Sequence, residues 1–375
     1  MYNTIKRVTL MDNKPHKFSE IKKFIVSHIL ENNLKPGDKI PTIRFFAEKL
    51  HTSTLTVHRA IASLVSEGML DSMIGSGTYV AETNKIGIIF PLNDGLSQNS
   101  YLSEILRGLD DAVKEKDFFP VFFKFPDTDE KKVSFMEDIR KLNLRGLLVY
   151  ATSEWQEKNW DMIKALNISS VCVNNFPDSS AFSGVSLNNR KAGNIAAEHF
   201  IECGHQNFAL VGNSSDTSSV KERISGFKES INKIDMVLNK SHIFVNQILL
   251  PDDYDRIADK ISTFPKPLAV FAINDSIAYE LIRRFFKMGI RLPDEVSIIG
   301  VDNQDFGSKI IPSLSSIKQP AYQMGVKAVK MLMEKIEHPE ISGDVSRILL
   351  EPELITRESV CNLKILKRTA EQKTL

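Results

Sequence analysis

Apolar and polar positions follow two different periods along this chain, and the change of period falls near residue 84. Before it, apolar side chains recur every three or four positions, which is the spacing of a buried helix face. This spacing predicts helices from Phe18 to Asn33, from just after Thr42, and from about Ser53. The run Leu70–Ala81 predicts two short strands around Gly75-Ser76-Gly77. Three helices followed by a hairpin form a winged helix-turn-helix.

Local signals mark the ends of these predicted helices. Lys35-Pro36-Gly37-Asp38 ends the first helix, because Pro and Gly resist continuing one. Thr42 is a candidate N-cap of the second helix, and Gly68 closes the third. The buried face of the first helix is predicted to contain Phe18, Ile21, Ile25 and Ile29.

From Lys85 onward, short apolar runs alternate with helical patterns. This alternation predicts parallel sheets with helices on both faces, and its length favours two sheets over one. The fold class is therefore expected to be α/β, preceded by the winged helix. The predicted strands are 86–90, 121–125, 146–150, 171–173, 208–211, 243–245, 269–272 and 297–301.

Composition changes this picture mainly through the distribution of charge. The 375 residues are 42% apolar and 25% charged, with a net charge of +1, as in ordinary globular proteins. Residues 1–84 nevertheless carry 11 Lys and Arg against 8 Asp and Glu. This local excess favours a polyanion as the partner of the winged helix.

Several protein classes are excluded by what the sequence lacks. The three cysteines have no C-x-x-C spacing, so we expect neither a disulfide framework nor a zinc cluster. No apolar run approaches the roughly 18 residues of a membrane span, and the first residues do not form a signal peptide. We therefore expect a cytoplasmic protein with no membrane partner.

The winged helix offers a set of candidate DNA contacts. A recognition helix presents its N-terminal residues to base edges in the major groove, and the preceding helix lies at the phosphate backbone. Arg44 is placed to reach a phosphate, and Leu55 can touch a thymine methyl. An alternative stays open, in which the hydroxyl residues are ordinary N-caps and the glycines ordinary turn residues. The candidate DNA-binding residues are Thr42, Arg44, Thr52, Ser53, Thr54, Thr56, His58, Arg59, Gly75 and Gly77.

A family resemblance rests on motifs in residues 16–81. These motifs are Leu34–Arg44, Thr56–Ala60, Leu64, Gly68–Leu70 and Gly75–Val80. In this order of turn, helix and wing, the segment resembles the GntR family of bacterial regulators. Thr54 and His58 stand where that family commonly has Arg, so the resemblance implies a winged-helix DNA reader but no particular operator.

A second resemblance covers residues 85–360. Its motifs are Ala197–Phe200 with Gly204-His205, Arg223 with Gly226-Phe227, Ala269–Asp275, Leu292–Asn303, Ile317–Pro320 and Leu350–Ser359. They resemble the ligand-binding domain of LacI/GalR repressors, which is similar to periplasmic sugar-binding proteins. Asn188-Asn189 replaces the usual Asp-Asn, and a short linker near Ala81–Asn84 replaces the family's hinge helix. The domain pairing is similar to that of arabinose repressors.

This resemblance implies a two-lobed, doubly wound, periplasmic-binding-protein-like effector domain. We expect the winged helix over residues 10–82, the effector domain over 85–360 and a disordered tail over 361–375. Lobe 1 is expected over about 85–186 and 318–342, and lobe 2 over about 187–317 and 343–360. The chain is expected to cross between lobes near Val185–Leu187, Ser316–Gln319 and Ser342–Val345.

The same resemblance implies an effector held between the lobes, at the carboxyl ends of the strands. An amide, a carboxylate and a guanidinium there can together bind several hydroxyl groups. Three alternatives stay open: Asn274 can cap the next helix, Asp302 can form an Asx turn, and Arg223 can bridge surface carboxylates. The aromatic candidates can equally belong to the core. The candidate ligand-binding residues are Tyr101, Tyr150, Asn174, Arg223, Asn274, Asp302 and Gln319, with Asn99, Ser100 and Trp155 as further candidates.

No motif points to catalysis, a cofactor or a metal. Walker, G-x-S-x-G and H-E-x-x-H patterns are absent from the sequence. The acidic run Asp252–Asp255 has no histidine nearby and is expected to be the solvated first turn of a helix. We therefore expect no catalytic residues, no metal ligands, no cofactor and no enzymatic activity.

The expected function is that of a DNA-binding transcriptional regulator. We expect a homodimeric repressor of a carbohydrate-utilisation operon, with operator DNA and a small effector, a monosaccharide, as partners. Two alternatives stay open: a regulator that senses a purine or nucleoside, and a cytoplasmic sugar-binding receptor without DNA function. The effector, the operator and the direction of the response stay open as well.

Overall fold

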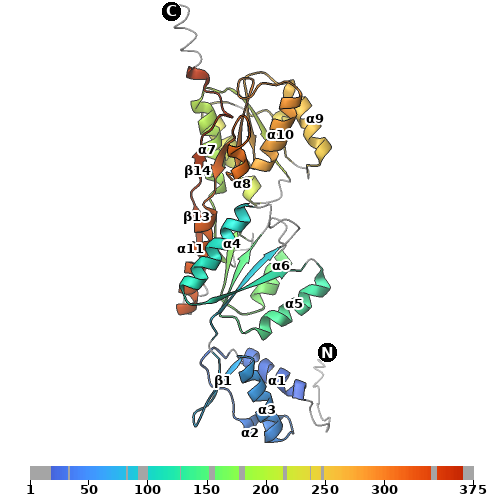
Figure 1. Cartoon of the computed structure of the whole chain (residues 1–375), viewed down its shortest axis with the longest axis vertical. Coiled ribbons are helices and arrows are strands. Elements are labelled where there is room, and N and C mark those ends of the chain that lie inside the picture. The colour runs from blue at the N-terminus through green and yellow to red at the C-terminus, as the bar shows by residue number, and fades with distance from the viewer. Residues whose placement is uncertain are drawn as a thin grey trace, which may run out of the picture. The chain divides into compact units, whose positions relative to one another are not determined.

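The computed structural model describes residues 18–32, 34–81, 83–91, 100–126, 128–151, 157–176, 182–213, 218–236, 238–245, 249–338 and 344–365. The chain divides into two compact units. The first unit consists of Met1–Lys85 and Thr128–Arg145, and the second of Ile86–Asp127 and Gly146–Leu375. The winged helix belongs to the first unit, and both large sheets are built on the second (Figure 1).

The winged helix-turn-helix forms as the sequence predicts. It consists of α1 (Phe18–Glu31), α2 (Ile43–Lys49), α3 (Thr54–Ser66) and the antiparallel hairpin of β1 (Leu70–Met73) and β2 (Gly77–Val80). Its core contains Ile21, Ile25, Phe46 and Leu64, all of them buried. Phe18 was predicted to share the buried face but is 44% exposed, because it is the first residue of α1 and lies at the edge of this core.

The linker that follows the hairpin is bonded to a distant part of the first unit. After α5 (Asp129–Lys141), Asn143 Nδ2 donates to the Ala81 carbonyl oxygen at 3.1 Å. The Arg145 N–H donates to the Lys85 carbonyl oxygen at 2.9 Å.

The first sheet has six strands in the order β13-β7-β6-β5-β3-β4. The strands are β3 (Lys85–Pro91), β4 (Phe119–Phe125), β5 (Gly146–Tyr150), β6 (Ser170–Asn174), β7 (Ser183–Leu187) and β13 (Arg347–Leu350). With this sheet go α4 (Ser100–Glu115), α6 (Glu157–Lys164) and α11 (Ala321–Glu337), of which α4 and α11 pack together. Strands β5 and β7 are buried along their whole length, as expected of parallel strands covered on both faces.

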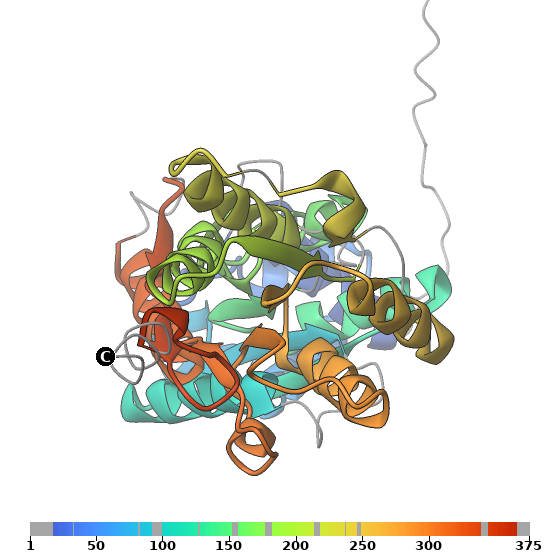
Figure 2. The same cartoon turned by 90° about the horizontal axis from the view of Figure 1, so that it is seen from above.

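The second sheet also has six strands, in the order β14-β12-β11-β10-β8-β9. They are β8 (Asn207–Val211), β9 (Ile243–Phe244), β10 (Leu268–Ala272), β11 (Val296–Val301), β12 (Ser315–Lys318) and β14 (Glu353–Ile355). Helices α7 (Asn189–Glu202) and α8 (Ser218–Asn232) lie on one side, and α9 (Pro251–Ser262) and α10 (Asp275–Lys287) on the other (Figure 2). Two 3-10 turns, η2 (Lys240–His242) and η3 (Asp305–Ser308), complete this lobe. The prediction of two largely parallel sheets is confirmed, although β14 runs antiparallel to β12.

The chain passes between the two sheets three times. The first two passages, between β7 and α7 and between β12 and α11, lie where the resemblance placed them. The third lies between β13 and β14, after Leu350, and not near Ser342–Val345. The reason is that β13 pairs in parallel with β7, so residues 347–350, predicted for the second lobe, belong to the first sheet.

The start of the predicted disordered tail is also corrected. The Cys361 N–H donates to Ser297 Oγ at 2.9 Å, and the Leu363 N–H donates to the Cys203 carbonyl oxygen at 2.9 Å. Cys361 is buried as well. Residues 361–365 are therefore part of the second lobe, because their backbone groups find partners there, and residues 366–375 lie outside the described residues.

Candidate effector site and nucleic-acid interface

The outer face of α3 carries the candidate base-reading residues. Thr54, His58 and Arg59 are exposed, while Val57 and Ala60 of the same helix are buried in the core. Leu55 is 60% exposed as well. Arg44, near the start of α2, is also exposed. These side chains are therefore available to a nucleic acid.

Two of the candidate hydroxyl residues cap helices. Thr42 Oγ1 accepts from the Phe45 N–H at 3.3 Å, and Ser53 Oγ accepts from the Thr56 N–H at 3.1 Å. Ser53 Oγ also lies 2.8 Å from Thr56 Oγ1. The capping alternative is thus realised for Thr42 and Ser53, while Thr52 is half-buried just before α3.

The wing requires its glycines for reasons inside the fold. Gly75 and Gly77 have φ values of 78° and 129°, in the left-handed region that favours glycine. A Cβ at Gly77 would also lie 2.5 Å from Lys39 Cε. Lys39 Nζ lies 5.8 Å from the centroid of the Tyr79 ring, so a lysine that the sequence analysis did not single out stands at the base of the wing.

In the second lobe, two of the predicted effector residues, Asp302 and Gln319, directly follow strands, and a third, Arg223, lies on helix α8. Asp302 Oδ1, after β11, accepts from Gln319 Nε2 at 2.5 Å, and Gln319 itself follows β12. Arg223, on α8, donates through Nε to Asn189 Oδ1 at 2.8 Å and through Nη1 to the Ile273 carbonyl oxygen at 2.6 Å. Arg223 is half-buried, and neither bond is the surface bridge weighed as its alternative.

Asn274 takes the alternative role that the sequence left open. It is the N-cap of α10, and its Oδ1 accepts from the Ile277 N–H at 2.9 Å. An N-cap oxygen satisfies one of the free donors of the first helical turn. Asn274 lies two residues beyond Ala272, the last residue of β10, so it still stands at the carboxyl end of the sheet.

The first lobe contributes a second group of polar side chains. Tyr101 Oη donates to Asn174 Oδ1 at 2.9 Å, and Asn174 Nδ2 donates to the Ala151 carbonyl oxygen at 2.9 Å. Tyr150 ends β5 and is buried, as one of its alternatives required. Asn99 and Trp155 lie outside the described residues, and Ser100 is described only as the first residue of α4.

The two groups of side chains influence each other electrostatically. Burial raises the pKa of Asp302 to about 6, against the opposing effects of the Arg223 guanidinium and the Gln319 hydrogen bond. Burial and the charge of Asp302 raise the pKa of Tyr150. Burial also raises the pKa of Tyr101, on which both Arg223 and Asp302 act. Charged side chains of the second lobe therefore act on tyrosines of the first.

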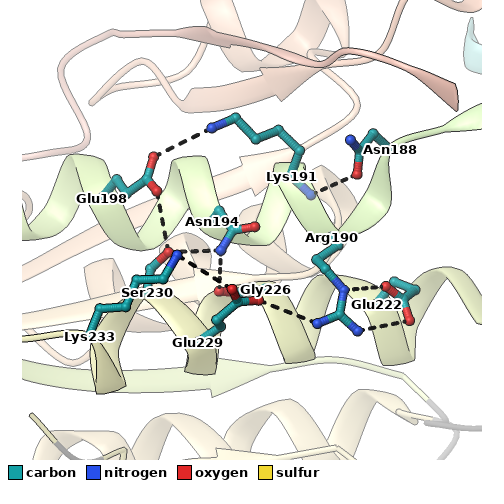
Figure 3. A network of polar contacts seen from close by, with 10 residues as sticks. All are labelled: Asn188, Arg190, Lys191, Asn194, Glu198, Glu222, Gly226, Glu229, Ser230 and Lys233. Carbon is teal, nitrogen blue, oxygen red and sulfur yellow. Dashed lines mark hydrogen bonds and ion pairs between the residues drawn. The ribbon is translucent and has the colours of Figure 1, made fainter.

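The position of Arg223 depends on close packing between α7 and α8. A Cβ at Gly193 would lie 2.0 Å from the Arg223 carbonyl oxygen, and one at Gly226 would lie 1.9 Å from the Arg190 carbonyl oxygen. Only glycine permits helices to approach this closely. Asn194 Nδ2 donates to the Gly226 carbonyl oxygen at 3.0 Å across the same contact (Figure 3).

Ion pairs flank this contact on the surface. Arg190 Nε lies 2.8 Å from Glu222 Oε2, and Arg190 Nη1 lies 3.3 Å from Glu229 Oε2 (Figure 3). The surface bridge considered for Arg223 is thus made by Arg190. Asn189, the partner of Arg223, was not among the predicted effector residues, although Asn188-Asn189 departs from the family pattern.

A cavity elsewhere in the second lobe is not part of this site. It has a volume of about 370 Å³, and Phe244, Val245, Asp253, Arg256 and Ile257 are among its lining residues. It lies between β9 and α9, at the edge of the second sheet. None of the predicted effector residues lines it, so we do not assign the effector to it.

No group of three or more His, Cys, Asp or Glu among the described residues has an arrangement that could hold a metal ion. None of the helices among them combines the length and the apolar character needed to cross a membrane.

Two family descriptions match the chain. Residues 18–80 match the bacterial regulatory proteins of the gntR family, and residues 197–360 match the periplasmic binding protein-like domain. The first match covers the winged helix, and the second covers most of the second lobe, β14 included, together with α11 and β13.

Individual proteins are similar over most of the chain. The arabinose metabolism transcriptional repressor of Geobacillus stearothermophilus is 26% identical over 366 residues, which cover 92% of this chain and 97% of that protein. The transcriptional repressor PurR of Photobacterium profundum is 25% identical over 320 residues, covering 85% and 92%. A LacI family transcriptional regulator from Enterococcus faecium, solved with bound ribose, has the same fold, with a TM-score of 0.62 and 23% identity over 74% of this chain and 99% of that one.

Proposed function

We propose that this chain, a transcription regulator that combines a GntR-family winged helix with a periplasmic-binding-protein-like domain, represses a carbohydrate-utilisation operon in response to a sugar bound between its two lobes. The arabinose repressor it resembles along nearly its whole length supports this role. The observation that supports the proposal most is that Asp302, which accepts from Gln319, acts electrostatically on Tyr101 and Tyr150 of the other lobe, as Arg223 does on Tyr101.

In this proposal the polar groups bind hydroxyl groups of the effector. The ionised carboxylate of Asp302 accepts from one or two hydroxyls, and the Arg223 guanidinium donates through the N–H groups not used by Asn189 and Ile273. Asn274 uses Oδ1 for its cap, so it offers Nδ2. Gln319 fixes the Asp302 carboxylate through their hydrogen bond.

The charge of the site favours an uncharged effector. The carboxyl groups of Asp302 and Asp275 stand against two guanidinium groups, those of Arg223 and Arg357, whose N–H groups are already partly engaged by protein acceptors. A phosphorylated sugar would bring further negative charge next to these carboxylates, which is costly in a poorly solvated site. A neutral monosaccharide therefore fits the proposed site better than its phosphate.

A purine or nucleoside is the second candidate effector. The similarity to repressors named PurR and the two tyrosines of the first lobe favour it, because aromatic faces suit a planar base. A thermal-shift screen with monosaccharides, their phosphates and nucleosides, followed by calorimetry, separates the candidates. Stabilisation by a neutral sugar supports the proposal, whereas stabilisation by nucleosides alone would replace it.

The winged helix supplies the proposed DNA contacts. Binding by a chain with this role takes place in the cytoplasm, where operator DNA is accessible. A sugar-binding receptor without DNA function is the alternative from another class. A gel shift with the chain's own promoter separates the two, because only a DNA-binding regulator retards the fragment. Exposed Thr54, His58 and Arg59 on α3 support the DNA-binding role.

Replacing Arg44 with alanine is expected to weaken the binding of the chain to operator DNA and to random DNA by similar factors. The physical reason is that a phosphate contact carries no sequence information. Without this contact, DNA binding releases about one counterion fewer. The slope of the logarithm of the binding constant against the logarithm of salt concentration should fall by about one unit. Fluorescence anisotropy at several salt concentrations measures this. A loss confined to the operator would mean that Arg44 reads a base.

We further propose that the chain binds DNA as a homodimer. A two-fold dimer requires half-sites separated by one helical turn of DNA or a multiple of it. Inserting about half a turn between the half-sites should therefore weaken binding at least several-fold, and inserting a full turn should restore it. Sedimentation of the free chain gives its oligomeric state independently. Equal affinity for all three spacings would contradict a dimer that holds its two heads in a set geometry.

A further inference from the structure

Asp275 is a buried carboxyl group that neither the DNA interface nor the effector contacts use. It is the first residue of α10, and its side chain is 0% exposed. Its Oδ1 accepts from Ser316 Oγ at 2.6 Å, and its Oδ2 accepts from the Gln304 N–H at 2.8 Å. A Cβ at Gly300 would lie 2.2 Å from Oδ1, so the carboxyl group lies directly against the backbone of β11.

Both hydrogen bonds lead to the loop that carries Asp302. Ser316 Oγ, which donates to Asp275, also accepts from the Asn303 N–H at 2.9 Å. Asp275 thus holds the backbone N–H groups of two successive residues, Gln304 directly and Asn303 through Ser316. These residues follow Asp302 immediately in the chain.

The backbone of this loop is in a conformation that needs support. Asp302 and Asn303 have φ values of 120° and 51°, in the left-handed region that residues other than glycine rarely adopt. Such a conformation costs free energy and persists only where its surroundings impose it. Here the surroundings include the Asp302 N–H, which donates to the Ile317 carbonyl oxygen at 2.9 Å.

Arg357 supports the loop from the other side. Its Nη2 donates to Asn303 Oδ1 at 2.7 Å, and its Nη1 donates to the Leu314 carbonyl oxygen at 2.5 Å. Asn303 is therefore bonded through its backbone to Ser316 and through its side chain to Arg357. The turn that presents Asp302 is enclosed by hydrogen bonds, of which those to Asp275 come from the most deeply buried group.

Charged and titratable groups on several elements act on Asp275. Asp302 and Arg357 act on it from the ends of β11 and β14, Arg223 from α8, and Tyr279 lies on α10 itself. Burial, together with the negative charge of Asp302, raises the pKa of Asp275 to about 7, against the hydrogen bonds from Ser316 and Gln304 and the charge of Arg357. The state in which both oxygens accept is therefore complete only above neutral pH.

We propose that Asp275 is a positioning residue, which holds the loop at residues 302–304 so that the Asp302 carboxylate is presented to the effector. The inference rests on the proposed function, because it gives Asp302 a ligand to bind. Asp275 acts through Ser316 and the Gln304 N–H and does not touch the effector itself. Loss of its carboxylate lets the loop leave the left-handed conformation and moves Asp302 away from its partner hydroxyls.

The test is effector affinity in Asp275→Asn, measured by calorimetry with the neutral sugar found in the screen. The amide has almost the shape of the carboxyl group, but its NH2 group cannot accept from the Gln304 N–H. At pH 8 we expect the variant to bind the sugar about tenfold more weakly, with operator affinity in the absence of sugar unchanged. Asp305→Asn, which removes an exposed carboxylate from the same loop, is the matched control and should bind like the wild type.

The pH profile separates positioning from a general loss of structure. In the wild type, affinity should rise with pH through about 7 as Asp275 loses its proton, above a separate step near 6 that belongs to Asp302. In Asp275→Asn only the step of Asp302 remains, so the variant and the wild type converge at pH 6. A ratio of affinities that is the same at pH 6 and pH 8 would overturn the inference.

A double-mutant cycle tests the route through Ser316. Ser316→Ala should also weaken sugar binding. The double variant should lose less binding free energy than the sum of the two single losses, because both residues act on one loop. Strict additivity, or wild-type affinity in Asp275→Asn, overturns the inference. Asp302→Ala in the same series distinguishes the failures, since normal binding by that variant would refute the proposed effector site itself.

Discussion

Replacing Asp302 with alanine is expected to weaken effector binding by roughly ten- to a hundred-fold or more. Hydrogen bonds to a charged group contribute about 1.5–3 kcal/mol each, and about 1.4 kcal/mol corresponds to a factor of ten in affinity. Asp302 is a half-buried carboxylate that is hydrogen-bonded to the side chains of Gln319 and Gln304, so its remaining lone pairs are the ones available to hydroxyls. Calorimetry on the purified variant measures the effect.

The pH and a neighbouring acid provide the controls for this prediction. Because burial raises the pKa of Asp302 to about 6, the wild type should lose effector affinity as the pH falls through 6, where the carboxylate that accepts from hydroxyls becomes protonated. The alanine variant should lack this step. Asp305→Ala removes an exposed acid three residues away and should change neither property. Undiminished sugar binding by Asp302→Ala would refute the assignment of the site.

Replacing Gly226 with alanine is expected to destabilise the second lobe and, as a consequence, to weaken effector binding. The added Cβ would lie 1.9 Å from the Arg190 carbonyl oxygen, which is part of the backbone of α7 and cannot turn aside as a side chain could. Forcing atoms into a close-packed contact typically costs 1–3 kcal/mol, occasionally more. Because Arg223 lies one helical turn before Gly226, separation of α7 and α8 also shifts its guanidinium.

Thermal unfolding and calorimetry check this second prediction. A loss of about 1–3 kcal/mol corresponds to a fall of several degrees in the unfolding temperature of a lobe of this size. Ser225→Ala, at the neighbouring position on α8, adds no atoms and is the matched control. An unchanged unfolding temperature for Gly226→Ala would mean that the two helices do not need their close approach.

The sequence predicted those parts of the fold that have a strong periodic signal. Strands such as Gly146–Tyr150 and Ala269–Ala272 are continuous apolar runs, because parallel strands are buried on both faces. Thr42 and Ser53 marked the starts of α2 and α3 because a helix N-terminus needs an oxygen acceptor. Local chemistry alone specified these elements.

The strands that were not predicted, among them β12 and β13, carry no such signal. In β12, the serines Ser315 and Ser316 are fully buried, and their hydroxyls are bonded to the Arg357 N–H and to Asp275. A polar strand of this kind is stabilised by partners about 40 residues away, which no local pattern reveals. The same holds for β13, whose pairing with β7 moved the third passage between the sheets.

The effector residues came from the resemblance and not from periodicity. The structure places Tyr101 with Asn174, and Gln319 with Asp302, as pairs that no spacing along the chain predicts. Asn274 shows the limit of such transfer, since the residue is in place but one of its atoms caps α10. Asn189 and Asp275 were missed because their importance lies in the residues they hold, Arg223 and the loop after Asp302.

The most direct test of the account is the affinity of the full chain for its operator with and without the effector sugar. Fluorescence anisotropy on a fragment selected from genomic DNA measures both constants, using a sugar that calorimetry has shown to bind. We expect saturating sugar to change the dissociation constant of the wild type about tenfold, as a typical coupling between two sites does, and to leave that of Asp302→Ala unchanged. An operator affinity that is the same with and without a bound sugar would contradict the claim that this chain is a sugar-responsive regulator.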